Sequence, residues 1–370
     1  MAKILSEYAD QVRSEIISVL ESKSGYFREL PGGGADLIKR LLKFSTGGKL
    51  FRGCLTVFGY GMFKNGKDKA ALMSGAVFKA GAALEILHSA LLIHDDIMDR
   101  DLLRRGEKSL FAQYGDFGNA RDVVDPEHFG LSMGICAGDI CFYIGTAVMA
   151  SLKADERVKS RILSLWSEEL QKVGLAQMQD ILLSSNANGI SESADTVSEE
   201  TILELYRYKT ARYTFSLPLV TGALLAGIEP PETDLLEKLG EVIGIIFQIK
   251  DDEIGLFGTE ERIGKPVGTD LEEGKQTLYR FYLTQALKAG KGDRNLRREV
   301  KDILDLRNAD GRSIAVLREA VKMLGVQQKL EEKTNELTEE AERVIHGLSV
   351  DEIHKAVLRE ILHLNLTRSR

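Results

Sequence analysis

Apolar residues recur at three- and four-residue spacing along almost the whole chain, which is the periodicity of helices that bury one face. Alternating strand patterns are nearly absent, and the 370 residues include only 6 prolines, which would interrupt helices. Helices are predicted at residues 4–22, 35–44, 49–63, 67–99, 131–152, 157–185, 198–226, 232–257, 275–289, 297–305, 312–324, 326–346 and 351–364, with a long loop at 115–130. We therefore expect an all-α protein.

The sequence shows no break that would separate two domains. It has no Pro/Ser-rich linker and no shift in composition, so we expect one domain over residues 1–370. A formal net charge of −7 argues against nucleic-acid binding by the surface as a whole. Apolar stretches such as SLPLVTGALLAGI fall short of the ~20 residues that span a bilayer, so no integral membrane segment is expected. Three cysteines without a CxxC pair fit a reducing cytoplasm.

Two aspartate clusters each end an apolar helical run. The first, LLIHDDIMDRD, contains Asp95, Asp96 and Asp99, and the second, IIFQIKDDEIG, contains Asp251 and Asp252. Carboxylates four residues apart share a helix face one turn apart. Hard oxygen ligands of this kind suit Mg²⁺ carrying a diphosphate. Acidic residues at the end of an apolar helix are commonly a solvated terminus, so the clusters gain weight only from the basic residues that accompany them.

Basic residues accompany both clusters. In GGKLFRG, Lys49 and Arg52 fall on one face of a helix that the glycine pair opens. Cations in a first turn oppose the helix dipole, and a bound phosphate would reconcile the two. Each cation could instead be a surface residue or a salt-bridge partner. Further candidates for phosphate contacts are Arg104, Arg105, Lys209, Lys265 and Lys275.

The order of these motifs resembles that of the trans-isoprenyl diphosphate synthases, or polyprenyl synthetases. The matching segments, within about residues 35–285, are GGKLFRG, EILHSALLIHDDIMDRDLLRRG, AGDIC, YKTA and FQIKDD followed by GKPVGTDLEEGKQTL. The resemblance implies an all-α isoprenoid-synthase bundle around a central active-site cavity, typically in a homodimer. It also implies Mg²⁺-dependent condensation of isopentenyl diphosphate with dimethylallyl, geranyl or farnesyl diphosphate.

The resemblance assigns roles position by position. Isopentenyl diphosphate would be held by Lys49, Arg52, His88 and Arg105. The allylic diphosphate would be held by Arg104, Lys209, Thr210, Gln177, Gln248, Lys265 and Lys275, with Lys209, Thr210 and Gln248 as the catalytic candidates. Mg²⁺ would be bound by Asp95, Asp99 and Asp251, supported by Asp96 and Asp252. One departure is Gly255, which stands where many members carry a third aspartate.

Three residues before the first aspartate motif bear on product length. Leu91, Ala90 and Leu87 lie one to two helical turns before Asp95, at about 5.4 Å per turn, and can form the floor of a tunnel for the growing tail. Short-product relatives carry aromatics at the first of these positions, so Ala90 and Leu91 favour geranylgeranyl diphosphate, with a longer product as the alternative. A terpene cyclase would have no use for the isopentenyl-binding set, and the intact first motif disfavours a non-catalytic regulatory subunit.

Overall fold

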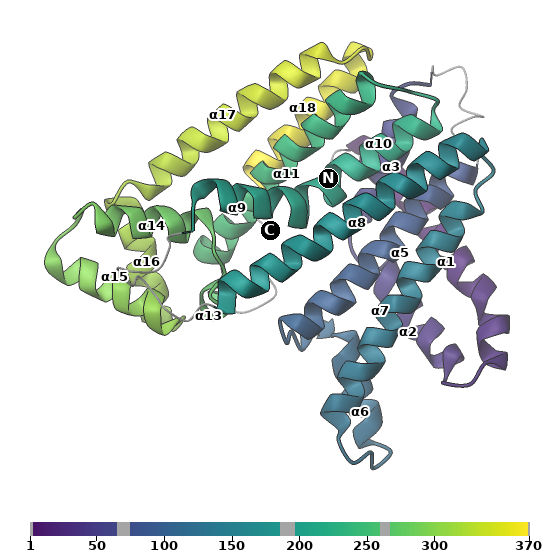
Figure 1. Cartoon of the computed structure of the whole chain (residues 1–370), viewed down its shortest axis with the longest axis horizontal. Helices are drawn as coiled ribbons and strands as arrows, with labels where there is room; N and C mark the ends of the chain where they lie inside the picture. The colour runs from purple at the N-terminus through teal and green to yellow at the C-terminus, as the bar shows by residue number, and fades with distance from the viewer. Residues whose placement is uncertain (1–2, 65–74, 186–196, 260–266, 369–370) are drawn as a thin grey trace. The chain divides into compact units, whose positions relative to one another are not determined.

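The computed structural model describes residues 3–64, 75–185, 197–259 and 267–368, and these are helical almost throughout (Figure 1). The helices are α1 (Lys3–Glu29), α2 (Gly34–Thr46), α3 (Phe51–Gly61), α5 (Gly75–Met98), α6 (Leu110–Asn119), α7 (Pro126–Ala150), α8 (Glu156–Ser185), α9 (Glu199–Leu205), the π-helix η2 (Tyr206–Ser216), α10 (Leu217–Leu225), α11 (Glu232–Phe257), α13 (Thr269–Glu272), α14 (Leu278–Lys288), α15 (Arg294–Leu306), α16 (Gly311–Met323), α17 (Val326–Gly347) and α18 (Glu352–Thr367). One antiparallel hairpin joins β1 (Leu103–Arg104) to β2 (Glu107–Lys108). The prediction of an all-α protein is confirmed.

The chain around residues 110–130 differs from the predicted long loop. Its first part forms α6, and α7 begins at Pro126, so only a short connection remains. Two glycines lower the helix propensity of α6, and the sequence pattern therefore missed it. A third glycine, Gly130 of α7, lets the two helices pack closely, because a Cβ there would lie 2.8 Å from the Gly115 nitrogen. Packing between the two helices here outweighs weak local propensity.

The contacts divide the chain into two compact units, which are described separately. Unit 1 comprises Met1–Trp166, Pro218–Asp234 and Val350–Val357. Unit 2 comprises Ser167–Leu217, Leu235–Ser349 and Leu358–Arg370. Helices α8, α10, α11 and α18 contribute residues to both units. That the whole of 1–370 acts as one domain stays a prediction.

Helix α5 lies at the centre of unit 1, where α1, α3 and α7 pack against it. Every residue from 80 to 90 is buried, as expected of a helix that is apolar on all sides. Small residues permit close helix packing: a Cβ on Gly53 of α3 would lie 3.0 Å from the Gly81 carbonyl oxygen, and one on Gly145 of α7 would lie 3.0 Å from that of Ala83. This packing fixes the helix that ends in the first aspartate motif.

Two helices, α5 and α7, are long and apolar enough by length and composition to cross a membrane. Two helices of this kind are weak evidence for a membrane span, because a buried core helix passes the same test, so the absence of an integral membrane segment stays a prediction. Within the most apolar window, 72% of α5 but only 44% of α7 is buried. Burial identifies α5 as a core helix of unit 1, whereas α7 leaves Ile135 and Tyr143 exposed.

In unit 2, helices α14 to α17 surround a core that includes Tyr282, Leu283, Leu317 and Val321. Ile245 and Ile249 of α11 belong to the same core. Because apolar burial is the main favourable term in folding, these contacts anchor the helix that ends in the second aspartate motif.

Candidate active site

The first aspartate motif occupies the C-terminal end of α5. The Asp99 N–H donates to the Asp95 carbonyl oxygen over 2.8 Å, so the helical turn continues through Asp99. The two carboxylates therefore lie one turn apart on one face. Both side chains are partly exposed, whereas Asp96 between them is fully buried.

Asp96 is held by Arg104 of the hairpin. The Arg104 Nε donates to the Asp96 Oδ1 over 2.6 Å, and its Nη2 lies 3.6 Å from a carboxylate oxygen of Asp95. Burial raises the pKa of Asp96 to about 6, although Arg104 offsets part of the rise. Arg104 is thus a salt-bridge partner of the first motif, the alternative that the sequence left open. Its contact with an allylic diphosphate stays a prediction.

The hairpin turn places Arg105 against the glycine-rich segment at 47–53. Arg105 and Gly106 have φ values of 56° and 76°, as a two-residue type I′ turn requires. The Arg105 Nη1 donates to the Gly47 carbonyl oxygen over 2.7 Å. Gly48 permits this approach, because a Cβ there would lie 2.8 Å from the Arg105 Cζ. Two segments predicted to bind isopentenyl diphosphate therefore meet.

His88 and Arg52 belong to the same neighbourhood. His88 is buried in α5, and burial together with the positive charges of Arg52 and Arg105 holds its pKa well below the usual range. A neutral imidazole therefore accompanies these guanidinium groups. Arg52 lies in the first turn of α3, and the exposed Lys49 precedes that helix. The structure thus brings His88, Arg52 and Arg105 together, and Lys49 lies just before α3 in the same 47–53 segment.

The predicted tunnel-floor residues are placed differently along α5. Ala90 and Leu87 are buried, while Leu91 is partly exposed. Leu87 faces α7, where a Cβ on Gly145 would lie 3.5 Å from the Leu87 Cβ. The assignment of these residues to a product tunnel stays a prediction.

In unit 2, glycines on one face of α11 let it approach η2 closely. A Cβ on Gly240 would lie 2.4 Å from the Ser216 nitrogen, and one on Gly244 would lie 2.4 Å from the Ala211 Cα. No side chain fits in either place, so the two backbones pack directly together. The sequence predicted one helix over 198–226, but η2 widens it to π geometry, a form that often accompanies functional sites.

Polar side chains continue this face of α11 toward the second aspartate motif. Thr210 Oγ1 donates to the Gln248 Oε1 over 2.9 Å, and Gln248 Nε2 donates to the Asp252 Oδ1 over 2.9 Å. Asp252 also accepts the Tyr206 hydroxyl, whose oxygen accepts the Leu278 N–H over 2.9 Å. Burial raises the pKa of Asp252 well above its ordinary value. Asp252 is therefore bound by protein donors, as Asp96 is in the first motif.

Asp251, in contrast, is exposed, and Arg368 Nη2 lies 3.1 Å from its Oδ1. Gly255 differs from the family pattern, and a Cβ on it would lie 3.1 Å from the Asp270 Oδ2. A carboxylate from α13 thus approaches the position where many family members carry their third aspartate. Asp270 lies 15 residues beyond Gly255 in sequence, so motif reading did not find it.

The remaining candidates have mixed surroundings. Lys209 forms an ion pair with Asp180 of α8, and Lys275 Nζ lies 2.6 Å from Glu273 Oε2. Gln177 Nε2 is buried and makes no hydrogen bond within the described part of the chain. Lys265 lies outside the described residues.

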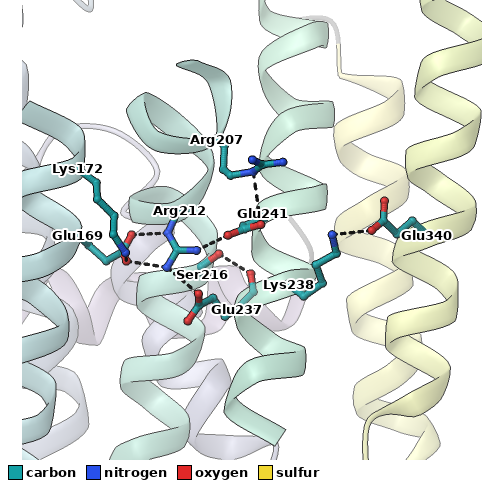
Figure 2. Close-up of polar contacts among 9 residues, drawn as sticks. All are labelled: Glu169, Lys172, Arg207, Arg212, Ser216, Glu237, Lys238, Glu241 and Glu340. Atoms are coloured by element: carbon teal, nitrogen blue, oxygen red, sulfur yellow. Dashed lines mark hydrogen bonds and ion pairs between the residues drawn. The ribbon is translucent and has the colours of Figure 1, made fainter. Parts of the chain in front are cut away.

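Arg212 is the centre of an ionic cluster that fixes η2 to α8 and α11 (Figure 2). Its Nε and Nη2 each donate to Glu169 over 2.7 Å, Nη2 also lies 2.7 Å from Glu237 Oε1, and Nη1 contacts Glu241. Burial would lower the pKa of Arg212, but the carboxylates outweigh it and raise the pKa. The cluster holds the backbone two residues beyond Thr210. Sequence reading missed Arg212, because its partners are distant in sequence.

The carboxylates of the aspartate motifs suit Mg²⁺ only together with other ligands. Within the described ranges, no three His, Cys, Asp or Glu side chains are grouped so that they would hold a metal ion by themselves. Mg²⁺ commonly takes one or two carboxylates and completes its octahedron with water and substrate phosphate. In unit 1, Asp95 and Asp99 supply two such carboxylates one helical turn apart, which fits a Mg²⁺ ion that arrives with a diphosphate. That Asp251 of unit 2 is a further Mg²⁺ ligand stays a prediction.

Comparisons with known proteins agree with this assembly of motifs. The polyprenyl synthetase family model matches residues 36–323. Geranylgeranyl diphosphate synthase of Sulfolobus acidocaldarius is 30% identical over 269 residues, which cover 68% of this chain and 72% of that protein. Nonaprenyl diphosphate synthase of Mycobacterium tuberculosis is 28% identical over 275 residues, which cover 74% of this chain and 71% of that protein.

Similarity in structure extends over nearly the whole chain. The crystal structure of geranylgeranyl pyrophosphate synthase from Corynebacterium glutamicum, complexed with isoprenyl diphosphate and magnesium, matches with a TM-score of 0.86 and 28% identity over 99% of both chains. The chain therefore belongs to the polyprenyl synthetase family of all-α prenyltransferases.

Proposed function

We propose that this protein condenses isopentenyl diphosphate with allylic diphosphates and releases diphosphate. The observation that carries the proposal is the meeting of Arg52, His88 and Arg105 at the 47–53 segment, in the same unit as the first aspartate motif. A class I terpene cyclase takes one diphosphate and has no need of a second cationic cluster. A non-catalytic subunit would not need the carboxylates of Asp95 and Asp99.

The chemistry requires the allylic carbon–oxygen bond to break, so that negative charge leaves with the diphosphate and an allylic cation remains. Groups that stabilise this charge more than the intact ester lower the barrier. Mg²⁺ on Asp95, Asp99 and Asp251 would neutralise the departing diphosphate. Lys209, Lys275 and Arg104 would bind its remaining oxygens.

The second half of the reaction depends on position. The isopentenyl double bond attacks the cation when Lys49, Arg52 and Arg105 hold its diphosphate at the right distance, and such positioning is worth several kcal/mol of the barrier. Thr210, Gln177 and Gln248 would face the cation with oxygen atoms. Loss of a proton completes the step, with the released diphosphate as the base that the family resemblance implies.

We infer that the main product is geranylgeranyl diphosphate. Ala90 is small and buried on α5, so it leaves room that an aromatic side chain would fill. The Sulfolobus relative named above is a geranylgeranyl diphosphate synthase, which supports this length. The nonaprenyl name of the Mycobacterium relative keeps a longer product as the alternative. We also infer a homodimer in the cytoplasm, with the exposed apolar face of α7 as its interface.

One incubation tests the proposal against its rivals. Purified protein with Mg²⁺, isopentenyl diphosphate and each allylic primer in turn should give linear prenyl diphosphates, sized by mass spectrometry after extraction. EDTA should abolish product, and so should Asp95→Asn. Cyclic hydrocarbon formed from the allylic substrate alone would indicate a terpene cyclase. Turnover that appears only after a second subunit is added would indicate a regulatory protein.

A further inference from the structure

Helix α3 begins where its own sequence supplies no cap. Its N-cap residue is Leu50, with φ 49° and no side-chain hydrogen bond, and its first turn contains no acidic residue. The first N–H groups of a helix need acceptors, which a polar N-cap residue normally provides. Here the acceptor comes from α5, because the Gly53 N–H donates to the Glu85 Oε1 over 2.7 Å.

The Glu85 carboxylate is enclosed by this arrangement. It is 5% exposed in an otherwise apolar stretch of α5, and a buried charge is costly unless it is paired. Burial raises the pKa of Glu85, while Arg52, Arg105 and the backbone N–H groups of Arg52 and Gly53 pull the pKa back. The negative charge of Glu85 is therefore compensated by two of the guanidinium groups near the 47–53 segment, those of Arg52 and Arg105.

The distance between the two helices is set by glycine. A Cβ on Gly53 would lie 3.0 Å from the Gly81 carbonyl oxygen and 3.2 Å from the Glu85 Cγ. The close contact brings the start of α3 within reach of the Glu85 side chain. Glu85 has no role in breaking the allylic carbon–oxygen bond, and a carboxylate does not bind phosphate, so its burial requires its own explanation.

We propose that Glu85 is a positioning residue for the isopentenyl diphosphate site, because it holds the start of α3, the turn that carries Arg52, in place. The inference rests on the proposed function. A helix N-terminus usually offers its N–H groups to phosphate. Here Glu85 already accepts from them, so the substrate diphosphate is left to the side chains of Lys49, Arg52 and Arg105.

The experiment compares Glu85→Ala with Glu85→Gln and measures KM for each substrate separately. Alanine removes the acceptor, and KM for isopentenyl diphosphate should rise about tenfold or more, the size of one lost buried hydrogen bond to a charged group. Glutamine keeps one acceptor oxygen, so KM for isopentenyl diphosphate in Glu85→Gln should stay within about threefold of the wild-type value. KM for the allylic substrate should change less than about twofold in both variants.

Thr221→Val is the matched control. Trp166 Nε1 donates to Thr221 Oγ1 over 3.1 Å in the same unit, so this variant also loses a buried hydrogen bond. It should lower the melting temperature and leave both KM values unchanged. If Glu85→Ala raised both KM values equally, or neither, Glu85 would be an ordinary core residue and the inference would be wrong.

Two further measurements keep the outcomes separate. If Glu85→Ala does not fold, Glu85→Asp replaces it, because a side chain one methylene shorter withdraws the acceptor and should give the same selective rise. If the wild-type protein shows no turnover, the proposed function fails on its own. Calorimetric binding of isopentenyl diphosphate then tests Glu85 directly: unchanged affinity in Glu85→Ala would overturn the inference.

Discussion

At the scale of single residues, the space beside α5 depends on side-chain size. Ala90 is fully buried, and Leu87 three positions earlier packs against α7 at Gly145. Interior positions of this kind tolerate added volume poorly, because neighbouring side chains are already close-packed. A larger residue at position 90 must therefore occupy either protein space or product space.

We predict that Ala90→Phe shortens the main product by at least one isoprene unit, because the ring would block the proposed tunnel one turn below Asp95. Added core volume should also cost about 1–3 kcal/mol of unfolding free energy. Product length is measured by mass spectrometry with farnesyl and geranyl primers. Leu92→Phe adds a ring to the same helix about 200° further round and should leave the length unchanged. Equal product lengths in wild type and Ala90→Phe would rule out the floor assignment.

Some functional residues could be predicted from the sequence alone, and others could not. Asp95 and Lys49 stand in motifs whose letters indicate their chemistry, although their ligand contacts stay predictions. Glu85 and Arg212 could not be found in this way. Each acts through a partner far along the chain, Gly53 at 32 positions and Glu169 at 43, and such pairs form only when helices pack. Local pattern contains no information about them.

At the scale of elements, helix type and helix ends were harder to predict than helix existence. The pattern over 198–226 predicted one continuous helix, whereas the chain forms α9, η2 and α10 in succession. The π geometry of η2 coincides with the approach of Gly244 to Ala211 and with the Arg212 cluster, both of which are tertiary contacts. Propensity alone cannot report a geometry that neighbouring helices impose.

The Arg212 cluster gives a pH-dependent prediction. Burial raises the pKa of Glu169, but the hydrogen bonds from Arg212 and Lys172 outweigh it and leave the pKa below its ordinary value. A depressed folded-state pKa stabilises the protein above the unfolded-state pKa, and the stabilisation is lost as pH falls through the folded-state value. Glu169→Gln should therefore lower the unfolding free energy by about 3 kcal/mol at pH 7, and by progressively less below about pH 4.

Urea titrations followed by circular dichroism at several pH values measure this difference. Glu340→Gln is the control, because its ion pair with Lys238 is partly solvated and worth at most about 1 kcal/mol. A Glu169→Gln penalty that stayed constant from pH 7 to pH 3 would contradict the charge-based account of the cluster.

At the scale of the whole molecule, the uncovered face of α7 bears on assembly. Ile135 is 48% exposed and Tyr143 is 75% exposed, and both lie on a helix with a long apolar stretch. Exposed apolar patches of this kind commonly mark protein interfaces. The wild-type protein should sediment at twice the chain mass of 41.0 kDa, and Ile135→Asp combined with Tyr143→Asp should yield monomer. Leu306→Asp, at an exposed leucine of α15, should remain dimeric. A wild-type monomer would contradict the proposal.

The two aspartate motifs belong to different compact units, yet the proposed reaction needs both on one diphosphate. Asp95→Asn and Asp251→Asn should each lower kcat/KM by about 10²–10⁴-fold, and the double variant should fall less than about tenfold further, because groups that act as one unit are not additive. Asp116→Asn, whose partner is Lys108, is the control and should combine independently with Asp251→Asn. If the losses in kcat/KM of the two single variants multiply in the double variant, each motif binds its own ligand. The proposal that both motifs act on one diphosphate leaving group would then be wrong.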